Sequence, residues 1–278
     1  MVLAAATVAP LLAQQDLLKR RPGPFLIYGP VRTVRDERAT FKSENGTFIE
    51  EPRMLIQTIE YNEDGTRQDW TYYVPQGNII LRRVETYDPD GRVLETNNFQ
   101  DGRLNDRVAC TYDDQKQLIE RVAYRRDGSV SSRTVFRRQG NQRESESWSY
   151  DFQGNIIAQN KTTNDLLAKR AQSVSINQQG VVQTESSMTE NPDGGREFRT
   201  EQSNGDSKRE VVTPLGKGGE ERVTYNKDGT VRGKERFLRE FDSYHNMIKT
   251  THLTAKVDSS EFEPVEITYR TITYYEKN

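Results

Sequence analysis

A five-residue motif recurs along this chain: an aromatic or aliphatic residue, three mostly polar residues, then glycine. It occurs at residues 61–65, 73–77, 87–91, 124–128, 136–140, 150–154, 176–180, 212–216 and 225–229. The segments 112–116 and 241–245 keep the same frame but end in Lys116 and His245. Neighbouring motifs are usually about 12 to 14 residues apart, or about twice that distance. A fixed period of this kind predicts a repeat architecture.

Backbone geometry explains the motif. A strand of about 8 residues followed by a tight turn returns the chain antiparallel beside itself, and such turns need a residue with positive φ. Asp90-Gly91 and Gln153-Gly154 supply it, because glycine has no Cβ to clash in the left-handed region. The segments between motifs, such as 78–87 and 116–124, have the composition of strands. The pattern predicts about 16 to 18 strands in sequential order.

The composition indicates a thin sheet. Hydrophobic residues make up only 33% of the 278, charged residues make up 29%, and the mean hydropathy is −0.90. A thick two-layer core normally requires more apolar side chains. The segment 92–99 has no cleanly apolar face, so cross-strand polar and aromatic pairs are expected to hold the strands together. We therefore predict an all-β fold, a long antiparallel meander that forms a twisted, curved or open half-barrel sheet.

The two ends of the chain differ from the repeats. Residues 2–13 form an apolar run of signal-peptide length, so 1–13 is a candidate signal peptide and export to the periplasm or the exterior is expected. Residues 14–278 are expected to form a single elongated β-repeat domain. Within it, 241–278 lacks the motif glycine, which suggests an atypical C-terminal cap for a terminal strand with one neighbour. Its segment 264–275 is expected to pair antiparallel with 246–256.

The sequence contains few residues that could form a catalytic, metal-binding or nucleic-acid-binding site. The net charge of −2 gives no basic footprint for nucleic acid, and the apolar run is too short to span a bilayer. With two histidines and the single Cys110, no zinc set is available, and no metal or cofactor site is expected. The pairs Glu144/Glu146 and Glu261/Glu263 share strand faces, so a hydrolase with paired carboxylates stays an alternative, although solvated strands carry the same pattern.

The motifs at 87–91, 150–154 and 225–229, which begin Tyr-Asp or Tyr-Asn, resemble the YD repeats of the Rhs family over roughly residues 57 to 256. Large members of that family wind such strands into a hollow shell around a toxic C-terminal domain. This chain is too short for such a shell and lacks the segment that precedes the toxin. The resemblance implies a similar strand architecture and an exported, surface-related role, as in small YD-repeat-like proteins of unknown activity.

The functional hypothesis is a non-catalytic exported binding or structural module that recognises another protein or a polysaccharide. Candidate binding residues are the aromatic side chains Trp70, Tyr72, Tyr73 and Trp148, for which cross-strand packing is the other interpretation. A periplasmic carrier of a lipid or other apolar ligand in the concave face of the sheet is an alternative. An apolar lining on one face would distinguish the carrier.

Overall fold

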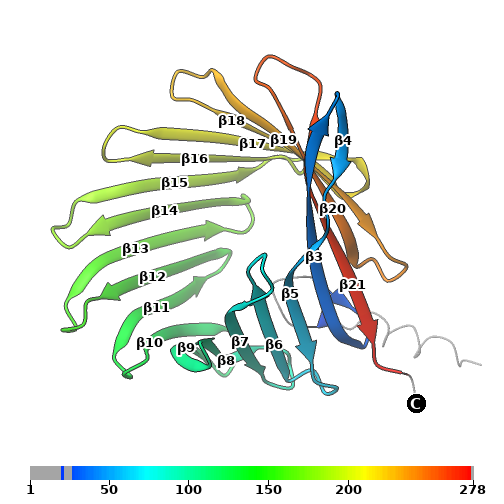
Figure 1. The fold of residues 1–278 in the computed structure, drawn as a ribbon. Helices are drawn as coiled ribbons and strands as arrows, with labels where there is room; N and C mark the ends of the chain where they lie inside the picture. Colours follow the sequence, from blue (N-terminus) through cyan, green and yellow to red (C-terminus); the bar gives the residue numbers. More distant parts are fainter. Residues whose placement is uncertain (1–19, 22–26, 277–278) are drawn as a thin grey trace, which may run out of the picture.

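The computed structural model describes residues 20–21 and 27–276 (Figure 1). The predicted signal peptide, residues 1–13, lies outside the described residues. Two short strands, β1 (Arg20–Arg21) and β2 (Ile27–Tyr28), pair with each other. All other described strands belong to one sheet.

The strands of this sheet follow one another along the chain. They are β3 (Val31–Glu44), β4 (Thr47–Glu50), β5 (Met54–Tyr61), β6 (Arg67–Tyr73), β7 (Ile79–Tyr87), β8 (Val93–Gln100), β9 (Arg103–Tyr112), β10 (Leu118–Arg125), β11 (Val130–Gln139), β12 (Gln142–Tyr150), β13 (Ile156–Asp165), β14 (Arg170–Asn177), β15 (Val182–Glu190), β16 (Arg196–Gln202), β17 (Ser207–Leu215), β18 (Gly219–Tyr225), β19 (Val231–Phe241), β20 (Met247–Ala255) and β21 (Glu263–Tyr274). A 3₁₀ turn, η1 (Gly216–Gly218), separates β17 from β18. Successive strands pair antiparallel, as the meander prediction requires.

The sheet closes into a barrel, and the predicted open half-barrel or curved sheet is therefore wrong. β3 pairs antiparallel with β21, from Thr40 opposite Glu266 to Val31 opposite Tyr274. In Figure 1 the blue β3 accordingly lies beside the red β21. The ring has 18 members in the described chain, β3 and β5 to β21, while β4 extends β3 as a hairpin.

Closure also changes the interpretation of the C-terminal segment. β21 pairs with β20, as expected for 264–275 and 246–256, but it has β3 as a second neighbour. The expectation of an atypical cap at 241–278 rested on a strand with a free edge. A closed ring has no free edge there, and β21 within this segment is the strand that closes the barrel.

The motif forms the turn that the sequence predicts. In the turn at 88–92 the N–H of Gly91 donates to the carbonyl of Asp88 at 2.9 Å, and the N–H of Asp88 donates to the carbonyl of Arg92 at 2.9 Å. Gly91 has a φ of 81°. This is the three-residue hairpin loop that ends in a left-handed residue. Lys116 (φ 64°) and His245 (φ 63°) keep that conformation without glycine.

Successive turns of a meander lie alternately at the two ends of the barrel. One end, here the Tyr274 rim, carries the turns at 62–66, 88–92, 113–117, 140–141, 166–169, 191–195, 216–218 and 242–246, together with the end of β21. The other end, here the Phe152 rim, carries the turns at 74–78, 101–102, 126–129, 151–155, 178–181, 203–206, 226–230 and 256–262.

A small apolar core lies where the first strands meet the last. Its buried members are Ile27, Val31, Val34, Ile59, Tyr61 and Trp70. The β2 segment is held there by Asn246, whose side-chain oxygen accepts from the N–H of Tyr28 at 2.7 Å and whose amide donates to the carbonyl of Tyr28 at 3.0 Å. The side chain of Asn246 thus makes the two hydrogen bonds with the backbone of Tyr28 that a neighbouring strand would make.

Candidate ligand-binding site

The two tryptophans lie on opposite faces of the barrel wall. Trp70 on β6 stands opposite Ile59 and Arg83. When the paired residues are followed from strand to strand, Arg83 on β7 and Ser149 on β12 lie on the same face as Trp70. Because alternate residues of a strand point to opposite faces, the neighbouring Trp148 lies on the other face. We call the two faces the Trp70 face and the Trp148 face.

The structure does not bring the four predicted aromatic residues together. Trp70 is 2% exposed and belongs to the apolar core, with the ring of Tyr72 stacked 6.2 Å from it. Burial raises the pKa of Tyr72. Tyr73 points to the Trp148 face, where its hydroxyl lies 3.4 Å from that of Thr58. Trp70 and Tyr72 thus pack within the fold, while Trp148 lies six strands away on β12.

Trp148 borders an aromatic groove at the Phe152 rim. The groove lies between the turns at 126–129 and 151–155 and encloses about 520 Å³. Its apolar lining is Val122, Tyr124, Val130, Tyr150 and Phe152. Trp148 stands directly opposite Arg133, which stands opposite Val122, so this cross-strand row runs along the edge of the groove. Phe152 is 77% exposed and presents its ring to solvent.

Two arginines organise the groove. Arg125 donates to the carbonyl of Val130 at 2.6 Å and to that of Tyr150, and its guanidinium lies 4.6 Å from the centre of the Phe152 ring. This contact holds the turn of Phe152 against β11. Arg133 donates to Glu120 at 2.6 Å, which places a guanidinium and a carboxylate side by side in the lining.

The turn beneath Phe152 is held by Asp151. Its carboxylate accepts from the Asn155 side chain at 2.9 Å and from the backbone N–H groups of Asn155 and Gln153. The hydrogen bond from the Asn155 side chain is the main cause that holds the pKa of Asp151 below its usual range. The carboxylate is therefore ionised at neutral pH and fixed in the turn.

The groove-lining aromatics Tyr124, Tyr150 and Phe152 were not identified from the sequence, although all three lie in or beside motifs. The available signal was the spacing: motifs two turns apart lie at the same rim, so the motifs at 124–128 and 150–154 must be neighbours there. An aromatic residue inside a turn, as at Phe152, is exposed by its position.

Of the carboxylate pairs, Glu144 and Glu146 both face polar or charged residues of neighbouring strands. Glu146 accepts from Gln159 and lies 3.1 Å from the ammonium of Lys161. Its neighbour Glu144 stands opposite Arg137. Across residues 20–21 and 27–276 no group of three or more His, Cys, Asp or Glu side chains is placed to hold a metal ion. Within the same residues, no helix has the length and apolar character of a membrane span.

No protein-family model and no curated protein matches the chain. Among solved structures, a porin-like protein from Bacteroides uniformis aligns with a TM-score of 0.43 and 8% identity, over 88% of this chain and 98% of that one. A porin-like protein from Bacteroides vulgatus aligns with a TM-score of 0.38 and 10% identity, over the same shares. The TcdB2-TccC3-Cdc42 structure aligns with a TM-score of 0.20 and 12% identity, over 80% of this chain and 16% of that one. We draw no function from alignments at this level, and the YD-repeat relationship stays a resemblance.

Proposed function

We propose that this protein is a non-catalytic exported binding module that recognises a polysaccharide at the aromatic groove of the Phe152 rim. The observation that carries the proposal is the lining itself, in which three aromatic rings flank a paired carboxylate and guanidinium. The apolar C–H face of a sugar ring packs on an aromatic ring, while Glu120 and Arg133 can accept from and donate to its hydroxyl groups. A concave apolar lining with a few fixed polar groups is typical of ligand sites.

The composition of the two faces favours this function over the lipid carrier. From β12 to β15 the Trp70 face carries mainly Ser, Thr, Asn and Ala, for example Ser147, Asn160 and Ser173. The Trp148 face carries charged pairs such as Glu197 and Arg209. Over these strands the Trp70 face lacks the apolar lining that a carrier requires. We propose an aqueous compartment outside the cell membrane for the barrel, which the apolar run at 2–13 supports.

The test is titration of the full chain with neutral oligosaccharides, followed by calorimetry and tryptophan fluorescence. Binding should change the fluorescence of Trp148, which borders the groove, and Trp148→Phe should abolish that change while leaving buried Trp70 as a constant background. Tyr150→Ala and Phe152→Ala should each lower affinity about tenfold or more, because aromatic residues that anchor a ligand carry much of the binding energy.

Leu167→Ala is the matched control. Leu167 is 80% exposed at the opposite rim, so its loss removes apolar surface without touching the groove, and affinity should not change. Binding of a protein but of no glycan, or equal losses in the control and the groove variants, would overturn the proposal.

A further inference from the structure

Many of the charged side chains of the barrel wall follow one rule. A cationic side chain lies beside a carboxylate of an adjacent strand in pair after pair: Arg82 with Asp69 (2.5 Å), Arg107 with Glu95 (3.1 Å), Arg133 with Glu120 (2.6 Å), Arg209 with Glu197 (3.1 Å) and Arg236 with Glu221 (2.7 Å). Opposite charges on facing strands stabilise a sheet, and like charges directly opposite destabilise it.

Arg138 on β11 and Arg143 on β12 break this rule. They stand directly opposite each other on the Trp70 face. Arg138 donates to the carbonyl of Gly140 at 3.3 Å and to the side-chain oxygen of Gln117 at 3.4 Å, and Arg143 lies 5.1 Å from the centre of the Phe136 ring. Among the ion pairs of the described residues, neither guanidinium has a carboxylate partner.

A second pair of facing arginines has the carboxylate partner that Arg138 and Arg143 lack. Arg199 on β16 and Arg209 on β17 also stand directly opposite each other. Glu197 lies between them, 2.6 Å from Arg199 and 3.1 Å from Arg209. The protein supplies an anion to that pair and supplies none to Arg138 and Arg143.

The unpaired guanidiniums line a hollow. It lies at the Tyr274 rim, among the turns at 113–117, 140–141 and 166–169, and encloses about 520 Å³. Its apolar lining includes Leu118, Ile119, Phe136 and Leu166. The hollow has room for an anionic group larger than a simple ion.

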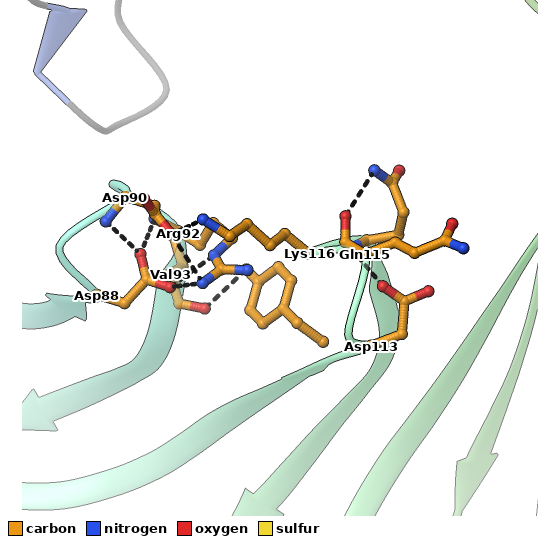
Figure 2. A network of polar contacts seen from close by, with 9 residues as sticks. Asp88, Asp90, Arg92, Val93, Asp113, Gln115 and Lys116 are labelled. Atoms are coloured by element: carbon orange, nitrogen blue, oxygen red, sulfur yellow. Dashed lines mark hydrogen bonds and ion pairs between the residues drawn. The ribbon is translucent and has the colours of Figure 1, made fainter.

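The other cations of the hollow, Lys116 and Arg137, already have carboxylate partners. Lys116 lies 2.7 Å from Asp90, the contact that joins two neighbouring turns in Figure 2. Arg137 stands opposite Glu144 on the Trp148 face and lies 3.9 Å from Glu146. Asp113 accepts from the N–H of Gln117 at 2.8 Å. The cations of the hollow that have no carboxylate partner among the described residues are therefore Arg138 and Arg143.

We propose that this hollow is an oxyanion site, in which a phosphate, sulfate or carboxylate group is held between Arg138 and Arg143. Guanidinium forks match such groups in shape and form two parallel charge-assisted hydrogen bonds. The group is either a free ion or an acidic substituent of a polysaccharide, and the apolar lining suits the sugar ring that would carry it. The site is at the rim opposite the aromatic groove and does not depend on it.

The test is the melting temperature of the full chain at low ionic strength, with inorganic phosphate in one arm and a uronic acid oligomer in the other. Potassium chloride at matched ionic strength is the reference. Phosphate or the oligomer at about ten times its Kd should raise the melting temperature by about 3 °C or more. A response to phosphate identifies a free-ion site, and a response to the oligomer well beyond that to an equal concentration of acetate identifies a polysaccharide substituent.

Arg138→Gln and Arg143→Gln should abolish this response. Without ligand each variant should melt at the same or a higher temperature than the unmodified protein, because the substitution removes repulsion between facing like charges. Arg236→Gln is the control: it breaks a surface ion pair elsewhere, lowers stability slightly and keeps the full response. No stabilisation beyond that of chloride, or a response retained in both arginine variants, would overturn the proposal.

Discussion

Asp36 on β3 and Arg270 on β21 form a buried two-point ion pair across the seam that closes the barrel. The guanidinium donates to both carboxylate oxygens, each at 2.7 Å. Gln57 on β5 donates to the same carboxylate at 2.6 Å. Two strands from the start of the chain and one from its end thus meet at one carboxylate, and this fixes which residues of β3 face which residues of β21.

Loss of the arginine alone should be strongly destabilising. Arg270→Met leaves the carboxylate of Asp36 buried without its counter-charge, and breaking a buried pair in this way costs about 3 to 5 kcal/mol. We expect this loss in the free energy of unfolding measured with urea. The half-exposed pair of Arg236 and Glu221 is the comparison, where Arg236→Met should cost about 1 kcal/mol or less.

The double variant Asp36→Leu with Arg270→Met separates charge from packing. Because an apolar pair of similar volume carries no desolvation penalty, the double variant should be more stable than Arg270→Met alone. If the double variant were less stable than the single one, the seam would depend on the ion pair itself and not on the removal of an unpaired charge.

Gly218 is expected to be less replaceable than Gly77, another turn glycine with positive φ. It has a φ of 79°, and a Cβ at this position would lie 2.8 Å from the ring of Phe241. Gly77 has a similar φ of 82° with no atom within 4 Å of its Cβ position. Gly77→Ala should therefore cost about 1 kcal/mol for the backbone conformation alone, and Gly218→Ala about 1 kcal/mol more for displacement of the ring.

A double-mutant cycle tests whether the ring of Phe241 causes the extra cost at Gly218. In a Phe241→Ala background the excess cost of Gly218→Ala should disappear, since the obstructing ring is gone. Chemical denaturation of the four proteins gives the coupling energy, and additive effects would show that the ring of Phe241 does not limit this position.

Glu197 should contribute stability that is lost in acid. Hydrogen bonds from Arg209 and Arg199 lower its pKa to about 2. Since the pKa is lower in the folded state than the unfolded value of 4.5, the stabilisation is present above pH 4.5 and is lost as the pH falls towards 2. Arg199 is exposed and Arg209 half-exposed, so we expect about 1 kcal/mol or less.

Urea denaturation of Glu197→Gln at several pH values checks this. The difference from the unmodified protein should be largest at pH 7 and shrink below pH 4.5. Glu201→Gln, on the same strand and face, is the control and should show a smaller difference at pH 7. A Glu197→Gln difference that is constant down to pH 2 would contradict the prediction.

The sequence predicts the repeating part of the fold because that part is local. The motif fixes a turn within five residues, and Gly91 or Gly154 needs no distant contact to adopt a positive φ. Lys116 and His245, which stand at the glycine position of the motif, also adopt a positive φ. Strand order, turn positions and the pairing of the last two strands could therefore be derived in advance.

Closure and the candidate sites depend on contacts that no local pattern encodes. The pairing of β3 with β21 joins Asp36 to Arg270, 234 residues apart. Trp70 looks in sequence like an exposed ring on a polar strand, but the β2 segment adds Ile27 to the core that buries it. Predicting the groove near Trp148, or the pairing of Arg138 with Arg143, requires the register of the strands. That register is known only from the folded barrel.

Tyr274 should make the seam sensitive to alkali. Its hydroxyl donates to Asp242 at 2.9 Å and accepts from Asn246 at 3.0 Å, and burial, followed by the bond to Asp242, raises its pKa to about 12. Because this pKa is above the unfolded value of 10.0, the stabilisation is fully present below pH 10 and is lost as the pH rises towards 12. Tyr274→Phe should cost about 1 kcal/mol at pH 8, and the difference in unfolding free energy should decline above pH 10. A difference that stays constant up to pH 12 would show that the hydroxyl of Tyr274 does not hold the turn at 242–246 against the seam.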